Sequence, residues 1–207
     1  MRKVILAAVA MSALYFGAAQ ARTISDPVND FLPTYTGVHD ADLDVTSFTV
    51  DYNAGTQMFT LAATFAGPIN PAEGGAYVIG ADTGTGLLHP FAALGEPNVV
   101  FNQVIAVKQT GVATIAGNPN LTATITGDMF SVLVPLADLP STGFAPMDYG
   151  FNLWPEDLNK SISDFAPQNA TLSAVPEPSA WAMMAAGVAM VGFAMRRSRS
   201  AAKTVLA

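Results

Sequence analysis

Cysteine is absent from all 207 residues of the sequence. Its absence excludes disulfide bonds, thiolate nucleophiles, zinc centres built on cysteine and lipid attachment at an N-terminal cysteine. A chain without cross-links has to rely on a hydrophobic core, and the roughly 150 residues between its two ends are enough to enclose one. We therefore expect one folded domain that is stabilised by apolar packing.

Basic residues are scarce in the body of the chain. Residues 22–177 contain only Arg22, Lys108 and Lys160 against all 16 acidic residues, which gives a formal net charge of −13. Binding to nucleic acid needs a basic patch that neutralises phosphates, and three bases cannot form one. The composition therefore excludes nucleic acid as a partner and favours a soluble exported domain, or one that holds a cation.

Histidine occurs only as His39 and His89. A Ser–His–Asp triad would need one of them beside a serine on a strained turn, and the Gly-x-Ser-x-Gly pattern of such turns does not occur. Asp82-Thr83-Gly84 matches the triplet of aspartic proteases, but that chemistry needs two aspartates sharing one proton, and the chain has no second triplet. We therefore expect a turn at 82–84 and a non-catalytic protein. The alternative is a secreted hydrolase with an unrecognised site.

The N-terminus carries the pattern of a secretory signal peptide. The bases Arg2 and Lys3 precede a long uncharged run, and the small residues Ala19 and Ala21 at its end form a cleavage signal. The pattern predicts a signal helix in the first 21 residues and export through the Sec machinery. Cleavage after Ala21 would leave Arg22 as the new N-terminus.

The C-terminus carries a second apolar segment. A Pro-Glu-Pro tripeptide at 176–178 precedes an uncharged run over 180–195 and three arginines. A helix over this run would be about 24 Å long, somewhat less than a hydrocarbon core of about 30 Å, so the pattern predicts a single short transmembrane helix. The arginines place its end in the cytoplasm by the positive-inside rule. We therefore expect the exported chain to be anchored in the inner membrane.

This order of tripeptide, apolar helix and basic end resembles the PEP-CTERM sorting signal of Gram-negative bacteria, which is handled by exosortase. The resemblance covers residues 175–200 and implies processing by an exosortase-type membrane enzyme, often in organisms that make exopolysaccharide. It implies an exported protein of the cell envelope or extracellular matrix, held first at the inner membrane and then at the cell surface or outside the cell. The implied sorting residues are Pro176, Glu177 and Pro178 for recognition, and Arg196, Arg197 and Arg199 for holding the helix until processing.

The body between these ends is predicted to consist of short strands. Apolar side chains occupy every second position from Phe59 to Phe65, which is the period of a strand with one buried face. A hairpin at 53–56 is expected to connect the strand at 57–65 to an earlier one at 43–52. Further strands are expected at 76–82, 99–108, 112–116, 121–126, 129–135 and 149–154, separated by Gly, Pro, Asn and Asp.

About eight short strands without crossover helices imply an all-β, jelly-roll-like antiparallel β-sandwich over residues 22–165. Residues 166–178 contain three prolines among small or polar residues, so they are expected to form a semi-rigid linker to the anchor.

The order of these signals is also similar to the β-sandwich superfamily of family-nine carbohydrate-binding modules and DOMON domains. The similarity bears on the fold. For function, the sequence favours a binding or structural module, with polysaccharide or Ca²⁺ as its ligand. The similarity is carried by an acidic entry at Asp40 and Asp42, strands at 45–52, 57–65, 77–82 and 129–136, and an aromatic strand at 149–154.

Two candidate binding sites follow from residue spacing. Asp40, Asp42 and Asp44 would point to one side of a strand, where three carboxylates repel one another unless a cation such as Ca²⁺ lies among them. The alternative is a solvated loop edge before a strand. Trp154 is expected on the face opposite Tyr149, either stacking against a sugar ring or packing as part of the core or its lid. No cofactor other than Ca²⁺ is indicated.

Overall fold

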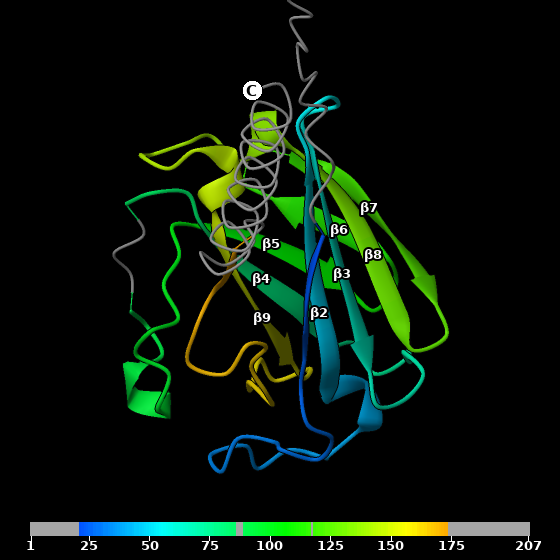
Figure 1. The fold of residues 1–207 in the computed structure, drawn as a ribbon. Helices are drawn as coiled ribbons and strands as arrows, with labels where there is room; N and C mark the ends of the chain where they lie inside the picture. Colours follow the sequence, from blue (N-terminus) through cyan, green and yellow to red (C-terminus); the bar gives the residue numbers. More distant parts are fainter. Residues whose placement is uncertain (1–20, 86–88, 117, 174–207) are drawn as a thin grey trace, which may run out of the picture.

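A computed structural model of the chain describes residues 21–85, 89–116 and 118–173 (Figure 1). The expected signal helix and transmembrane helix lie outside these ranges. Within them, no helix has the length and apolar character needed to cross a membrane. The helical elements of the described residues are short 3-10 helices, namely η1 (Ala41–Leu43), η2 (Ala92–Leu94), η3 (Leu136–Asp138) and η4 (Pro146–Asp148).

The described residues form ten strands, which confirms the all-β class expected from the sequence. The strands are β1 (Arg22–Ser25), β2 (Val45–Asn53), β3 (Met58–Phe65), β4 (Ala76–Asp82), β5 (Gln103–Lys108), β6 (Val112–Ile115), β7 (Asn118–Thr126), β8 (Met129–Pro135), β9 (Gly150–Glu156) and β10 (Leu172–Ser173).

Strand β3 illustrates how local sequence produces these elements. Its side chains alternate between half-buried and buried along the whole strand, with Phe59 and Leu61 completely buried. The turn before β3 forms because the side-chain oxygen of Asn53 accepts hydrogen bonds from the backbone N–H groups of Gly55 (2.9 Å) and Thr56 (3.1 Å). The antiparallel pairing of β2 with β3 confirms the predicted hairpin.

All ten strands of the described residues belong to one antiparallel sheet, in the order β1-β2-β3-β8-β7-β6-β5-β4-β9-β10. Strand β7 joins its two halves, because Leu121 and Thr122 pair with β6 whereas Ala123 to Thr126 pair with β8. The sheet curls into a nearly closed barrel (Figure 1). The two separate sheets of the expected sandwich are therefore replaced by one continuous sheet. Its first strands approach its last ones, β1 lying near β10 and β2 near β9.

The interior of the barrel is the main hydrophobic core. Phe65, Phe130 and Tyr77 pack in a triangle, in which the ring centroids of Phe65 and Phe130 lie 4.3 Å and 5.2 Å from that of Tyr77 and 6.0 Å from each other. The ring centroids of Phe59 and Tyr149 lie 5.6 Å apart. These two rings and the three of the triangle are all at most 2% exposed. Aromatic packing on this scale supplies the stability that a chain without disulfide bonds requires.

A second hydrophobic cluster covers the outer face of β4 and β9. Loops before β2, before β5 and after β9 fold over these two strands, so both strands are buried on both faces. This double burial accounts for the nearly continuous apolar sequence of β4. The cluster consists of Leu32, Tyr35, Leu43, Val78, Val99, Phe101, Trp154 and Phe165.

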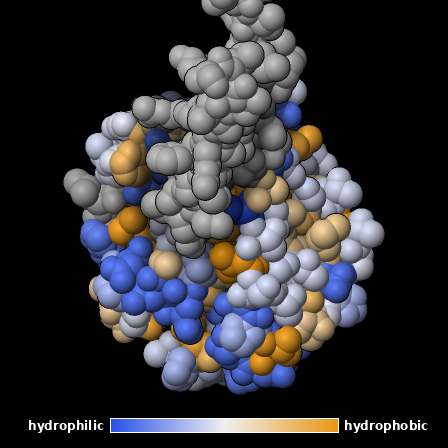
Figure 2. Space-filling model, in the orientation of Figure 1, coloured by the Kyte–Doolittle hydropathy of each residue, from blue (hydrophilic) through white to orange (hydrophobic). Residues whose placement is uncertain are grey.

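On the face drawn in Figure 2, hydrophobic side chains of the described residues are scattered in small groups among hydrophilic ones. Among the exposed large hydrophobic residues, Val38 and Leu158 have the largest exposed fractions, 71% each. Scattered apolar side chains of this kind are normal on protein surfaces and do not by themselves mark a docking site.

The folded body continues beyond Phe165, where the sequence predicted the start of a linker. Ala166 pairs with Leu153 of β9 through two backbone hydrogen bonds of 2.8 and 2.9 Å. The side-chain amide of Asn152 donates to the carbonyl oxygens of Pro167 (2.6 Å) and Ala170 (2.8 Å), and β10 then pairs with β9. The expected boundary is therefore corrected, because residues 166–173 cover the outer edge of β9 instead of standing free.

Candidate functional site

Three carboxylates meet where the two ends of the sheet approach each other. Asp26 follows β1, and its backbone N–H donates to the carbonyl oxygen of Thr46 (2.9 Å). Asp30 lies in the loop after it, and Asp164 lies in the segment that runs beside β9. One carboxylate oxygen from each aspartate lies within 4.8 Å of the other two. We call Asp26, Asp30 and Asp164 the acidic group.

Asp164 is held rigidly by the backbone around it. Its side chain is only 1% exposed. Its Oδ2 accepts a hydrogen bond from the N–H of Val45 (3.0 Å) and its Oδ1 accepts one from the N–H of Phe165 (2.6 Å). The neighbouring hydroxyl of Ser163 donates to the carbonyl oxygen of Leu43 (2.7 Å). These bonds tie the segment after β9 to the start of β2.

Asp44 lies beside the acidic group and is also 1% exposed. Its Oδ2 accepts a hydrogen bond from the N–H of Asn29 (2.8 Å), whereas its Oδ1 is buried without a hydrogen-bond partner. Two oxygens of the acidic group, Asp26 Oδ2 and Asp30 Oδ1, are likewise buried and unpartnered. Buried polar atoms in proteins are nearly always satisfied, so three unpartnered carboxylate oxygens in one place call for an explanation.

The electrostatics of the acidic group oppose ionisation. Burial raises the pKa of Asp164 to about 7 against the lowering effect of its two backbone hydrogen bonds, and the charges of Asp30 and Asp44 add to the rise. The pKa of Asp26 is raised to about 8, first by burial and then by negative charges, which are those of Asp164, Asp30, Asp44 and Glu96. Either a proton or a cation would relieve this repulsion. Proton exchange between Asp164 and a substrate is disfavoured because the Asp164 side chain is buried and has almost no contact with solvent.

Of the three aspartates on which the sequence-based calcium prediction rests, Asp40 and Asp42 remain neighbours and line one surface hollow. All three lie on or beside the 3-10 helix η1, not in the strand that the prediction assumed. The Oδ2 atom of Asp42 accepts hydrogen bonds from Asn70 N (3.0 Å) and Gln109 Nε2 (2.9 Å). Asp40 also lines a second pocket, which Asp42 does not reach. Of the three, Asp44 alone lies beside the acidic group.

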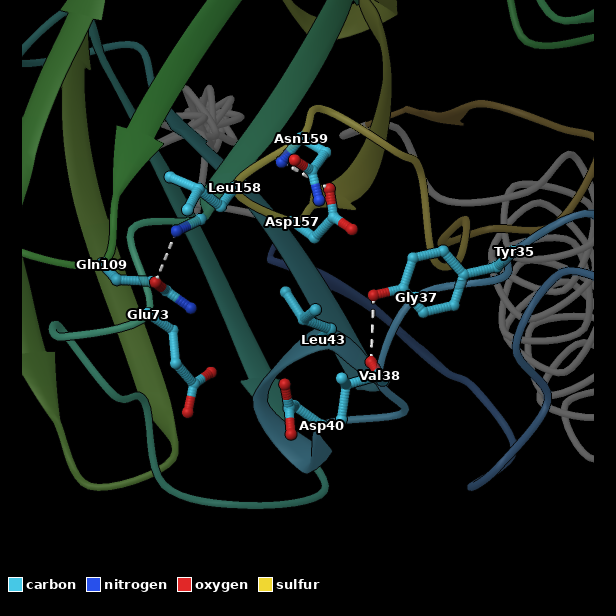
Figure 3. Close-up of a pocket in the computed structure, with 11 residues that line it drawn as sticks. Tyr35, Gly37, Val38, Asp40, Leu43, Glu73, Gln109, Asp157, Leu158 and Asn159 are labelled. Carbon is cyan, nitrogen blue, oxygen red and sulfur yellow. Dashed lines mark hydrogen bonds between the residues drawn. The ribbon is translucent and has the colours of Figure 1, made fainter.

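That pocket has a volume of about 250 Å³ and opens on the surface near η1 (Figure 3). The phenol of Tyr35 borders it and donates a hydrogen bond to the carbonyl oxygen of Val38 (2.9 Å). The Gln109 side chain accepts a hydrogen bond from Gly75 N (2.8 Å) at the opposite wall. Its polar lining combines three carboxylates with two amides, from Asp40, Glu73, Asp157, Gln109 and Asn159. Such groups can hydrogen-bond to the hydroxyls of a small polar ligand.

Trp154 is 3% exposed and belongs to the second hydrophobic cluster. Its ring centroid lies 4.8 Å from that of Phe91, in an edge-on contact, and 5.1 Å from that of Phe101. Its indole N–H donates to Glu156 Oε1 (3.2 Å). Neighbouring rings cover Trp154, so it packs in the core, which was one of the two alternatives predicted from the sequence. Its ring is therefore covered in this structure and does not present a face to a sugar.

The other residues singled out in the sequence have structural surroundings. Asp82 Oδ1 accepts a hydrogen bond from Gly84 N (2.9 Å), and Gly84 has a φ of 138°, so the triplet forms the expected turn after β4. The ring of His39 stacks on Phe31 at 4.3 Å between centroids. The Nδ1 atom of His89 is 2.9 Å from the carbonyl oxygen of Pro97. None of these contacts joins them to the acidic group.

Sequence reasoning missed Asp26, Asp30 and Asp164. Their only signal was the large excess of acids over bases, which indicated a cation without indicating its position. The hydrogen bond between Val45 and Asp164 joins residues 119 positions apart, and no local spacing pattern reports such a contact.

Fold and site together define an all-β domain, with buried carboxylates where its sheet closes and with its last strand directly before the C-terminal segment. Residues 174–199 match the model of the PEP-CTERM protein-sorting motif, which confirms the resemblance found in the tail. The chain thus carries a PEP-CTERM sorting motif, which marks a protein for sorting to the cell envelope by exosortase, a membrane enzyme. No curated protein shows a significant sequence match to it.

Proposed function

We propose that the β domain is a non-catalytic binding or structural module that is displayed in the envelope or matrix once the tail has been processed. The observation that carries the proposal is the direct connection between domain and sorting motif. Ser173 is paired in β10, and the motif begins at residue 174. Only two residues separate Ser173 from Pro176, so the tripeptide lies at most about 11 Å of chain from the domain. The domain is therefore the part that sorting delivers.

The proposed route begins with Sec-dependent export and cleavage after Ala21. Arg22 then starts the mature chain, at the first residue of β1, which pairs with Val50. The short C-terminal helix holds the chain in the inner membrane, with the arginines at 196, 197 and 199 on its cytoplasmic side. Pro176 and Pro178 fix φ on both sides of Glu177 and remove two backbone donors, so the tripeptide presents one carboxylate to the enzyme.

A polysaccharide is the ligand class that the pocket near η1 supports best. Carboxylates and amides converge on an open cavity of about 250 Å³, which suits a sugar with many hydroxyl groups. The carboxylates of Asp40 and Glu73 face this cavity from two different loops (Figure 3). A binding module of this kind could attach the sorted protein to exopolysaccharide in the matrix.

The sorting step is tested with Glu177→Gln in cells that contain an exosortase. The substitution leaves the apolar helix and the arginines intact, so export and membrane insertion should be normal while the shorter form disappears from a blot. Ser179→Ala is the matched control and should be processed like the wild type. Intact mass of the processed wild-type chain should also place its N-terminus at Arg22. Normal processing of Glu177→Gln, or none of the wild type, contradicts the proposed recognition.

The binding step is tested on a glycan array with the full chain in detergent. We expect a set of neutral glycans on the array to bind the wild-type chain. The binding signal should fall at least tenfold in a variant that carries both Asp40→Asn and Glu73→Gln. Asp148→Asn, an exposed position outside the pocket, is the control and should keep the signal. Equal binding by both variants would place the ligand elsewhere, and cleavage of the arrayed glycans would favour a secreted hydrolase.

A further inference from the structure

We propose that Asp26, Asp30, Asp44 and Asp164 form a Ca²⁺ site that closes the barrel where the two ends of its sheet meet. Three of these residues belong to the β1 and β2 side of the barrel, and Asp164 belongs to the segment beside β9. Figure 1 shows β2 and β9 next to each other at this junction. The inference does not depend on the proposed function, because it concerns the folded domain itself.

The donor atoms are already gathered and buried. Oxygens of the acidic group lie within 4.8 Å of one another, which is the spacing of ligands around one ion. Asp44, 1% exposed, adds a buried Oδ1 that has no hydrogen-bond partner, and Asp26 and Asp30 each add another such oxygen. The oxygens of Asp164 each accept one N–H group, which leaves a lone pair on each for a metal. Hydrogen bonding within the protein therefore leaves this cluster unsatisfied.

The charge balance calls for a cation. Burial raises the pKa of Asp26 and of Asp164, and the neighbouring charges that add to the rise are those of other aspartates and Glu96. Residues 22–177 supply only three basic side chains for 16 acidic ones. Several buried carboxylates without a counter-ion are costly, and a divalent ion that binds to all of them removes the repulsion between them.

The ligand types select Ca²⁺ among the common divalent ions. All the donors are carboxylate oxygens, which hard cations prefer, whereas zinc sites usually include nitrogen or sulfur ligands. Mg²⁺ keeps several waters and binds through one or two carboxylates in strict octahedral geometry. Carboxylates from three separate segments, completed by water, can supply the many oxygen ligands and the flexible geometry that Ca²⁺ takes.

A bound ion would connect the loop after β1 to the segment that runs beside β9. The loop that carries Asp30 also contributes Leu32, whose N–H donates to the carbonyl oxygen of Ser163 (2.8 Å). Leu32 and Phe165 both pack in the second hydrophobic cluster. An ion bound to Asp30 and Asp164 would therefore hold both segments over the outer face of β4 and β9. Loss of the ion should loosen these segments first.

The test uses the full chain in detergent, stripped with EDTA and then dialysed. Thermal unfolding is followed by circular dichroism in EDTA, in about 10 mM Ca²⁺ and in about 10 mM Mg²⁺. A site filled a hundredfold above its dissociation constant should raise the midpoint by about 5–10 °C. Calorimetric titration at 20 °C should give one Ca²⁺ per chain, with a dissociation constant on the order of 10⁻⁴ M as in extracellular sites.

Asp30→Asn is the main variant because Asp30 Oδ1 makes no hydrogen bond that the substitution would break. It should lose the Ca²⁺ shift while melting in EDTA at the wild-type midpoint or above it, since one repulsive charge is removed. Asp40→Asn is the matched control and should keep the full shift. If Asp30→Asn fails to fold, Asp26→Asn with the same titration takes its place.

Several results would overturn the proposal. No bound Ca²⁺ in the titration, together with equal midpoints in Ca²⁺ and EDTA, would mean that the carboxylates share protons instead. A full shift in Asp30→Asn, or a shift lost only in Asp40→Asn, would place the ion elsewhere. An equal shift with Mg²⁺ would refute the choice of Ca²⁺.

Discussion

Replacing Trp154 by alanine tests whether the second hydrophobic cluster stabilises the domain. Trp154 is 3% exposed, and its ring lies among Phe91, Phe101 and Phe165 at centroid distances of 4.8, 5.1 and 6.1 Å. On the other side, the backbone of β4 approaches closely at Gly80, where an added Cβ would lie 2.9 Å from the Trp154 ring. The side chain is thus enclosed, and its removal leaves a cavity.

The expected loss follows from the buried area. A buried tryptophan removes about 150–250 Å² from water, which at about 25 cal/mol per Å² is roughly 4–6 kcal/mol. Measured Trp-to-Ala substitutions in cores cost about 3–5 kcal/mol, so we expect the free energy of unfolding to fall by that amount. For a chain of this length the thermal midpoint should drop by about 6–20 °C.

The assay is thermal or urea unfolding of the purified chain, followed by circular dichroism at constant Ca²⁺ concentration. Trp154→Phe is the matched control. It keeps an aromatic ring and loses the N–H bond to Glu156, so it should cost about 1–2 kcal/mol. A loss below about 1 kcal/mol for Trp154→Ala would refute the enclosed packing. If Trp154→Ala lost glycan binding while its stability was unchanged, Trp154 would instead stack against a sugar ring, which was the other alternative predicted from the sequence.

Two further predictions concern the backbone. Gly84→Ala should destabilise the domain by about 2–4 kcal/mol in the same unfolding assay, because Gly84 has a φ of 138° and an added Cβ would lie 2.4 Å from Gly143 N. Gly95→Ala, at a φ of 92° with nothing within 4 Å of the added Cβ, should cost only about 1 kcal/mol, and equal losses would refute the contact between the two loops. A chain ending at Phe165 should lack a cooperative melting transition that a chain ending at Ser173 retains, because the shorter chain exposes the edge of β9. A cooperative transition in both would instead support the linker predicted from the sequence.

Local patterns were enough to predict much of this protein. The alternation around Phe59 predicted β3, and turn-forming residues after Asn53 predicted the hairpin, because both depend on neighbours in the sequence. The sorting motif at 174–199 could be recognised for the same reason, since an enzyme that reads a linear tripeptide and an apolar helix needs no folded context. Trp154 could be placed on the face opposite Tyr149, but periodicity does not tell whether that face is covered.

Tertiary structure decided the remainder. Strand β7 is long enough to pair with both β6 and β8, and this shared pairing turned the expected sandwich into one curled sheet. The 3-10 helix η1 replaced the strand expected at Asp40 to Asp44, and only Asp44 of these aspartates came to lie beside the acidic group. Closure of the sheet brought Asp26 and Asp30 to Asp164, although most of the chain lies between them. Strand alternation and turn chemistry act between residues a few positions apart, whereas the acidic group exists only because long-range strand pairing joins the first and last parts of the domain.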